Sequence, residues 1–179
     1  VGWVAMVRKE NDKAEGEFEK ALGLNPTNGQ VSYWLATAII SQRKVDKLPK
    51  ALFHLARAAH YDGPGALTPE GRKQILPYFD KQYANYHGDK EGVEKVIELA
   101  KASALPKPDF DIESKVKRYE RDLAAQAEQD KKFPEKALWR TIKDTLNSVD
   151  GQKYFDESMR NAAVPGGVEV AGSRGVELK

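Results

Sequence analysis

The feature that most constrains this chain is a spacing of small and large residues that occurs twice in its first third. Each copy places a small, a large and a small residue at intervals of four and three. The positions are Ala14, Phe18 and Ala21 in KAEGEFEKALGLNP, and Ala51, Leu55 and Ala58 in KALFHLARAAHYD. Small residues let two helices approach closely and the large residue fills the space beside them, so the pattern predicts stacked pairs of antiparallel helices.

These motifs resemble tetratricopeptide repeats, whose signature is W-x2-L-G-x2-Y, then A-x3-F-x2-A, then P. The first unit matches the A-x3-F-x2-A triplet fully and ends at Asn25-Pro26, where the proline stops the second helix of the pair. A third copy is predicted over residues 88–104. Its triplet positions are Val93, Ile97 and Ala100.

The resemblance, to a bacterial protein of the tetratricopeptide repeat family, implies an all-α fold. About three divergent repeats, the first truncated, would form a solenoid of antiparallel helix pairs over residues 1–106. Residues 107–165 would form a helical extension that caps the array. Its apolar stripe is predicted within a helix over residues 112–130, at Ile112, Val116, Tyr119, Leu123 and Ala127. Residues 166–179 alternate valines around a glycine-rich turn and predict a short β-hairpin or the start of a following domain.

Helix boundaries follow from capping residues and prolines. Thr27 or Asn28 can cap a helix over residues 30–42, and Pro49 suits the first turn of the next helix. Thr68 begins a helix that reaches about residue 86, although Pro77 should kink it or split it in two. The helix that follows is predicted over residues 90–103.

Composition excludes several classes of function. Among 179 residues, 29 basic and 27 acidic side chains leave a formal charge of +2, too small and too interspersed for nucleic-acid binding. Cysteine is absent, which excludes disulfides and thiolate metal sites. No apolar run approaches the roughly 20 residues that a spanning helix needs, so no membrane insertion is expected. The chain begins without methionine inside the first repeat, so we expect the native N-terminus to be missing, and the compartment stays open between the cytoplasm and export to the periplasm.

Partner binding is expected on the concave surface that the first helix of each repeat lines in this family. The resemblance assigns ten residues to that surface: Trp3, Met6, Gln30, Tyr33, Thr37, Ile40, Tyr78, Gln82, Asn85 and Tyr86. Aromatic rings supply contact area and amides hold a peptide backbone, so the set suits an extended peptide. The competing interpretation is that several of these side chains pack beneath the C-terminal helices and have no face left for a ligand.

Other chemistry finds little support. The histidines His54, His60 and His87 are expected at the surface or at helix ends, because a spacing of six separates two of them around one helix. The segment DFDIESKVKRYE mimics the acidic positions of a calcium loop, but Ser114 stands where that loop needs glycine. No catalytic motif, metal site or cofactor is predicted.

The function that fits best is a non-catalytic scaffold or adaptor module, which binds a protein or peptide partner in the groove of the repeats. A second hypothesis makes the chain a structural part of a larger protein, docking a neighbouring domain or a second copy in a homo-oligomer through its C-terminal helices. Trp139, Tyr154 and Phe155 would carry that contact. An enzyme would need a pocket in which several polar groups converge, and no motif in the sequence predicts such a pocket.

Overall fold

The computed structural model describes residues 1–160, 167–169 and 176–178. The described chain is mostly helical, which confirms the all-α class. It divides into two compact units, residues 1–118 and residues 119–179. None of the described helices is both long enough and apolar enough to cross a membrane.

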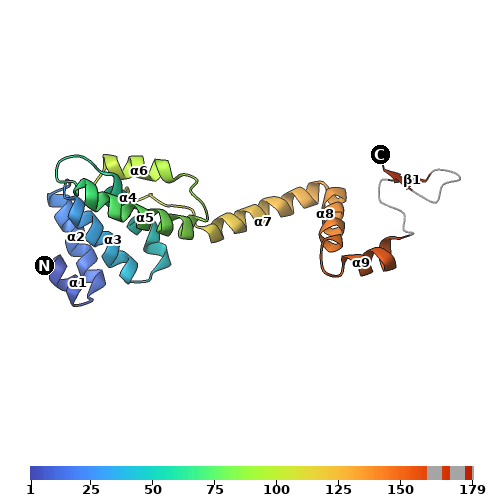
Figure 1. Ribbon diagram of the computed structural model, residues 1–179, viewed down its shortest axis with the longest axis horizontal. Helices are drawn as coiled ribbons and strands as arrows, with labels where there is room; N and C mark the ends of the chain where they lie inside the picture. Colours follow the sequence, from blue (N-terminus) through green and yellow to red (C-terminus); the bar gives the residue numbers. More distant parts are fainter. Residues whose placement is uncertain (161–166, 170–175, 179) are drawn as a thin grey trace. The chain divides into compact units, whose positions relative to one another are not determined.

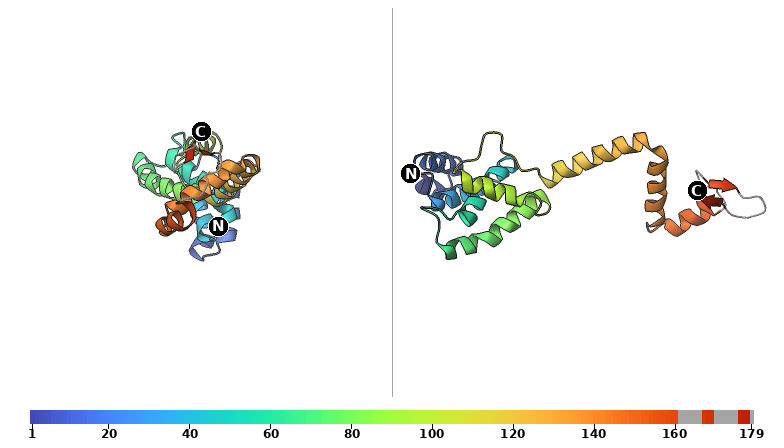
Figure 2. Two further views of the ribbon diagram at one scale, coloured as in Figure 1. Left: turned by 90° about the vertical axis from the view of Figure 1, so that its right-hand side faces the viewer. Right: turned by 90° about the horizontal axis from the view of Figure 1, so that it is seen from above.

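The first unit is a body of packed helices (Figure 1). Its elements are α1 (Gly2–Val7), α2 (Asn11–Leu24), α3 (Gly29–Ser41), the 3-10 turn η1 (Val45–Lys47), α4 (Leu48–His60), α5 (Pro69–His87) and α6 (Val93–Ala102), followed by the first turn of α7 (Lys115–Lys132). Helix α4 packs against α3, α5 and α6, and α2 packs between α1 and α3. In Figure 2, seen from above, these helices again gather in one body.

The helix caps are those that the sequence indicates. The Asn28 side chain accepts a hydrogen bond from the backbone N–H of Val31 at 3.1 Å, and Thr68 Oγ1 accepts one from Gly71 at 3.1 Å. Pro49 lies in the first turn of α4, where its missing N–H costs nothing. These local signals therefore place the starts of α3, α4 and α5.

Helix α5 does not split at Pro77. It runs without a break from Pro69 to His87, so of the two predicted alternatives the split into two helices is wrong, while the kink stays a prediction. Proline removes the hydrogen bond to the carbonyl four residues earlier, that of Lys73. Both Pro77 and Lys73 are exposed, so water can satisfy that carbonyl.

Two helices begin three residues later than predicted. Gly92 has a left-handed φ of 74°, so α6 starts only at Val93. Ser114 Oγ accepts a hydrogen bond from the backbone of Lys117 at 3.2 Å and so begins α7 at Lys115. Ile112 precedes α7 and is buried in the core of the first unit instead of continuing the helical stripe.

The core of the first unit has two clusters on either side of α4. One joins α2, α3 and the start of α4 around Phe18, Leu22 and Leu35. The other joins α4, α5 and α6 around Phe53, Phe79 and Tyr83 and also takes in Ile112. The six residues named for the two small-large-small triplets fall in these clusters, with Ala21 only partly buried.

The second unit contains the remainder of α7, α8 (Pro134–Leu146), α9 (Gly151–Tyr154) and the π-helical turn η2 (Phe155–Met159). Among its residues up to 160, Ile142 and Gly151 are buried. Strands β1 (Gly167–Glu169) and β2 (Val176–Leu178) pair antiparallel. Residues 161–166, 170–175 and 179 lie outside the described residues, so the hairpin expected over 166–179 stays a prediction.

Candidate partner-binding surface

Two hollows lie between α3 and α5. The first, called here the Tyr33–Tyr78 hollow, has a volume of about 250 Å³. Its lining is Gln30, Tyr33, Leu67, Gly71, Gln74, Ile75 and Tyr78. Among the described residues, none that lines it carries a charge. Burial raises the pKa of the Tyr78 phenol, and the neighbouring Tyr33 raises it further.

The second, called here the Tyr86 hollow, has a volume of about 450 Å³ and a mostly apolar lining. Its lining is Ile40, Val45, Leu48, Ala51, Leu52, Gln82, Asn85, Tyr86, Ser114, Lys115 and Val116. Burial raises the pKa of Tyr86, and Asp111 and Asp46 raise it further against the opposing effect of Lys117. The lining is therefore mostly apolar but includes the charged side chain of Lys115, and Asp46, Asp111 and Lys117 also act on Tyr86.

The two hollows follow one another along the same pair of helices. The first uses the beginnings of α3 and α5, and the second uses their ends, so the two helices run in the same direction. Tyr33 and Ile40 are seven residues apart on α3, which corresponds to about 10 Å of helix at 1.5 Å per residue. An extended peptide covers about that distance with three residues, at about 3.3 Å for each.

A backbone contact between two loops holds the first hollow in place. The N–H of Gly29, at the start of α3, donates to the carbonyl of Gly65 in the loop before α5, at 2.9 Å. Gly65 has φ 73°, and a Cβ there would meet the carbonyl oxygen of Thr27 at 2.5 Å. Only glycine therefore lets this loop approach the turn before α3, which brings the starts of α3 and α5 together.

Seven of the ten residues assigned to the binding surface line these hollows. Gln30, Tyr33 and Tyr78 line the first, and Ile40, Gln82, Asn85 and Tyr86 line the second. Thr37 lines neither, and its hydroxyl donates to the carbonyl of Tyr33 at 2.9 Å. Trp3 and Met6 lie apart, on α1: the Trp3 ring packs on Trp34 with centroids 5.2 Å apart, and Met6 packs against the first core cluster.

Three of the seven also pack against the core. Tyr33, Ile40 and Tyr86 are partly buried against the cluster around Phe53 and Phe79. Each of these side chains therefore supports the fold with one part of its surface and faces a hollow with another. Gln74, Tyr78 and Asn85 are exposed, so they can be replaced with little effect on the core.

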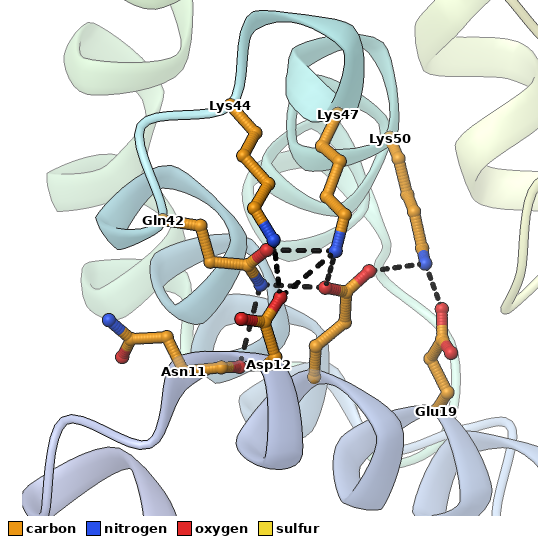
Figure 3. A network of polar contacts seen from close by, with 8 residues as sticks. Asn11, Asp12, Glu19, Gln42, Lys44, Lys47 and Lys50 are labelled. Atoms are coloured by element: carbon orange, nitrogen blue, oxygen red, sulfur yellow. Dashed lines mark hydrogen bonds and ion pairs between the residues drawn. The ribbon is translucent and has the colours of Figure 1, made fainter.

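A polar network on another face of the unit has a structural role (Figure 3). Buried Glu15 of α2 accepts hydrogen bonds from Gln42 at 2.6 Å, Lys47 at 2.6 Å and Lys50 at 2.7 Å. Burial opposes ionisation of this carboxyl, but the three donors outweigh burial and lower its pKa to about 2. Asp12 and Glu19 pair with the same lysines. The charges are matched within the network, which fastens α2 to the start of α4.

Arg57 of α4 is buried and joins α4 to two distant segments. Its guanidinium donates to the carbonyls of Ala100 at 2.6 Å and Ser103 at 2.8 Å, at the end of α6. It also donates to Pro26, in the turn before α3, at 2.8 Å, and lies 4.1 Å from the ring centre of Tyr61. Positive charge at the C-terminus of a helix is favourable. The side chain is therefore occupied by the fold and is not free for a ligand.

The expectation that all three histidines lie at the surface or at helix ends is wrong for His54. This residue is fully buried in the middle of α4, and neither ring nitrogen has a hydrogen-bond partner. Burial lowers its pKa to about 3, and Lys50 and Arg57 lower it as well. A neutral imidazole ring can occupy such a site as an apolar side chain would, so the spacing between histidines does not predict whether they are exposed.

His87 is the last residue of α5 and belongs to a group of polar side chains that surround Arg118. Its Nδ1 lies 2.7 Å from the carbonyl of Glu113, which only accepts, so Nδ1–H donates and Nε2 accepts from Arg118 at 3.0 Å. Arg118 also binds Asp89 at 2.8 Å and Glu91 at 3.0 Å. Ligand atoms of His87, Asp89 and Glu91 lie within 4.8 Å of one another, as a metal site would need. The Arg118 guanidinium already supplies the positive charge at that point.

Comparison with known proteins adds no relative: no family profile, no curated protein and no solved structure matches the chain.

Proposed function

We propose that residues 1–106 are a tetratricopeptide-like repeat module, which binds a segment of a protein partner along α3 and α5 without catalysing a reaction. The observation that carries the proposal is the convergence of residues from two helices that are far apart in sequence. The starts of α3 and α5 supply aromatic rings and amides. Their ends contribute Ile40, two amides and Tyr86 to the second hollow, whose remaining apolar lining comes from η1, α4 and α7. Rings provide contact area, and amides can pair with the backbone of a bound segment.

The sequential arrangement of the hollows supports an extended ligand over a compact one. A small molecule needs one enclosed site, whereas a peptide can use two shallow sites joined by its own backbone. Both hollows are set between packed helices that already have their partners in the core. A preformed surface of this kind reduces the ordering cost of capturing a flexible segment.

A second candidate function uses the C-terminal helices to dock a neighbouring domain or a second copy. The observation that favours it is the exposure of large apolar side chains in the second unit. Tyr119, Leu123, Phe133, Leu138 and Phe155 are each more than two-fifths exposed, at 64%, 48%, 45%, 43% and 43%. Surfaces of this kind mark interaction sites when the apolar residues are contiguous.

One experiment separates the two candidates with matched variants. The purified chain is used to capture partners from the extract of its native cell, next to Tyr78→Ala plus Asn85→Ala and next to Tyr119→Ala plus Asn147→Ala. All four positions are exposed, so circular dichroism should report an unchanged fold for both variants. We expect the first variant alone to lose a partner. If only the second variant loses a partner, the result would favour docking through the C-terminal helices. If both variants keep every partner, the result would contradict binding along α3 and α5.

A further inference from the structure

The two hollows differ in chemistry, and the difference restricts what a partner segment can contain. The following inference rests on the proposed function and deepens it. The Tyr33–Tyr78 hollow combines two phenols with the amides of Gln30 and Gln74. No charged side chain of the described residues lines it, so a charged group placed there would lose water without gaining an ion pair.

The Tyr86 hollow is larger and mainly apolar. Ile40, Val45, Leu48, Leu52 and Val116 line it, with the amides of Gln82 and Asn85 beside them. A volume of about 450 Å³ exceeds that of the first hollow and suits a bulky apolar group. The amides can pair with the peptide groups on either side of that group. Lys115 also lines the hollow, and the carboxylates of Asp46 and Asp111, which act on Tyr86, offset its positive charge, so neither an acidic nor a basic residue is favoured.

We infer that the partner segment is an uncharged, extended peptide with a bulky apolar side chain in the Tyr86 hollow. Three or four residues away it places an uncharged residue, preferably proline, in the Tyr33–Tyr78 hollow. The spacing follows from the seven residues between Tyr33 and Ile40 and the eight between Tyr78 and Tyr86, about 10 to 12 Å of helix. Proline fits because hollows lined by aromatic residues bind its ring and accept the extended conformation that it imposes.

A substitution of Val45 tests directly whether a partner segment binds in the Tyr86 hollow. It lines the hollow but is 66% exposed, so a charge can be introduced there without entering the core. Val7 is 64% exposed and lines neither hollow, which makes Val7→Asp a matched control. For the Tyr33–Tyr78 hollow, Gln74→Glu introduces a charge at nearly constant side-chain shape. Gln129→Glu, at another exposed glutamine, is its control.

The experiment is a selection of random twelve-residue peptides displayed on phage against the whole chain. Enriched sequences are then made as synthetic peptides, and their affinities are measured by fluorescence anisotropy for the parent and the four variants. We expect an enriched pair of positions, bulky apolar and uncharged, at a spacing of three or four. Val45→Asp should weaken binding at least about tenfold, because it puts a carboxylate on the mostly apolar lining that the bulky apolar group of the peptide would cover. Gln74→Glu should weaken binding by about threefold or more, because no side chain that lines the Tyr33–Tyr78 hollow can pair with the new charge, while both controls stay within about twofold.

The outcomes distinguish this inference from the proposed function. Peptides that require acidic or basic residues at these positions, and that still lose affinity in Val45→Asp, would overturn the inference and leave groove binding intact. Peptides whose affinity is the same for the parent, Val45→Asp and Gln74→Glu bind elsewhere, and that result would overturn both. A selection that enriches no sequence would count against both as well.

Discussion

Helices α4 and α7 are both amphipathic, yet they differ completely in what they bury. Ten residues of α4 are buried, including His54 and Arg57, whereas no residue of α7 is buried. Alanines at 51, 56, 58 and 59 let other helices approach α4 from several sides. The apolar residues of α7, such as Tyr119 and Leu123, are separated by long charged side chains and stay exposed. The contrast teaches that periodicity predicts a helix but does not decide whether other helices pack around it, since α7 also has closely spaced alanines and buries none of them.

The largest expected effect concerns the arginine within α4. Arg57→Met keeps the aliphatic stem but leaves the carbonyls of Pro26, Ala100 and Ser103 without their donor. The Ala100 carbonyl is buried and would be left unpaired, at a cost of about 1 to 3 kcal/mol, and the two part-buried bonds to the charged guanidinium are lost as well. We therefore expect the free energy of unfolding to fall by on the order of 3 to 5 kcal/mol. Urea unfolding followed by tryptophan fluorescence measures it.

Arg72→Met is the matched control for that variant. Arg72 is half-buried and donates to the carbonyl of Tyr61 at 3.0 Å. Its replacement should cost about 1 kcal/mol or less. Equal losses in the two variants would contradict the view that burial within α4 sets the cost.

The next effect is a dependence of stability on pH that originates in His54. Its folded pKa of about 3 lies below the ordinary 6.5, so its contribution is complete above pH 6.5 and is lost as the pH falls toward 3. At pH 5 the loss should be about 2 kcal/mol. His54→Leu should remove this slope between pH 6.5 and 4.5 while changing stability little at pH 7.5, because neither ring nitrogen has a partner to lose. An unchanged slope in the variant would contradict the assignment.

A smaller effect is expected for the carboxylate of Glu15. Its folded pKa of about 2 lies below the ordinary 4.5, so its stabilisation is present above pH 4.5 and is lost as the pH falls toward 2. Glu15→Gln should lower the free energy of unfolding at pH 7 by about 1 to 2 kcal/mol and flatten the acid limb of the stability curve. Thermal unfolding between pH 2 and pH 7 provides the measurement. Glu17→Gln, which breaks the surface pair with Lys20, should change it by less than about 0.5 kcal/mol.

The smallest effect is expected on α7. Leu123 is 48% exposed, so Leu123→Ala should change the free energy of unfolding by less than about 0.5 kcal/mol. Leu55→Ala, at a fully buried position of α4, should cost about 2 to 5 kcal/mol in the same assay. A large cost at Leu123 would mean that α7 buries its apolar stripe in solution, and that result would support docking through the C-terminal helices.

Local signals predicted much of the fold. The caps at Asn28 and Thr68 and the proline at the start of α4 depend on residues within one turn, so they can be recognised without knowing the neighbours. The later start of α6 depends on the left-handed conformation of Gly92, which the sequence allows but does not require. The continuity of α5 through Pro77 depends on exposure of the affected carbonyl, which is a property of the packed structure.

Only part of the lining of the two hollows could be predicted, because the rest depends on how distant segments pack together. Residues of α3 and α5 could be assigned by resemblance, but Val45, Leu48 and Val116 enter the Tyr86 hollow from segments outside those helices. Arg57 and Glu15 were missed because a charged residue in an amphipathic helix is usually solvated. Their neighbours offered a signal: Arg57 stands within the run ALFHLARAAH, and Glu15 follows the first alanine of a triplet.

The Arg57 guanidinium donates to four carbonyl groups and thereby links the local unfolding of two parts of the first unit. The four acceptors belong to Pro26, Ala100, Lys101 and Ser103. In an array in which each repeat touches only its neighbours, the terminal helix can fray alone. Here release of the end of α6 also strips the arginine of most of its acceptors, while its remaining bond is to the turn after α2. Amide protons of α6 and of the start of α3 should therefore exchange with solvent in one concerted event, so these two segments of the first unit share a single opening equilibrium.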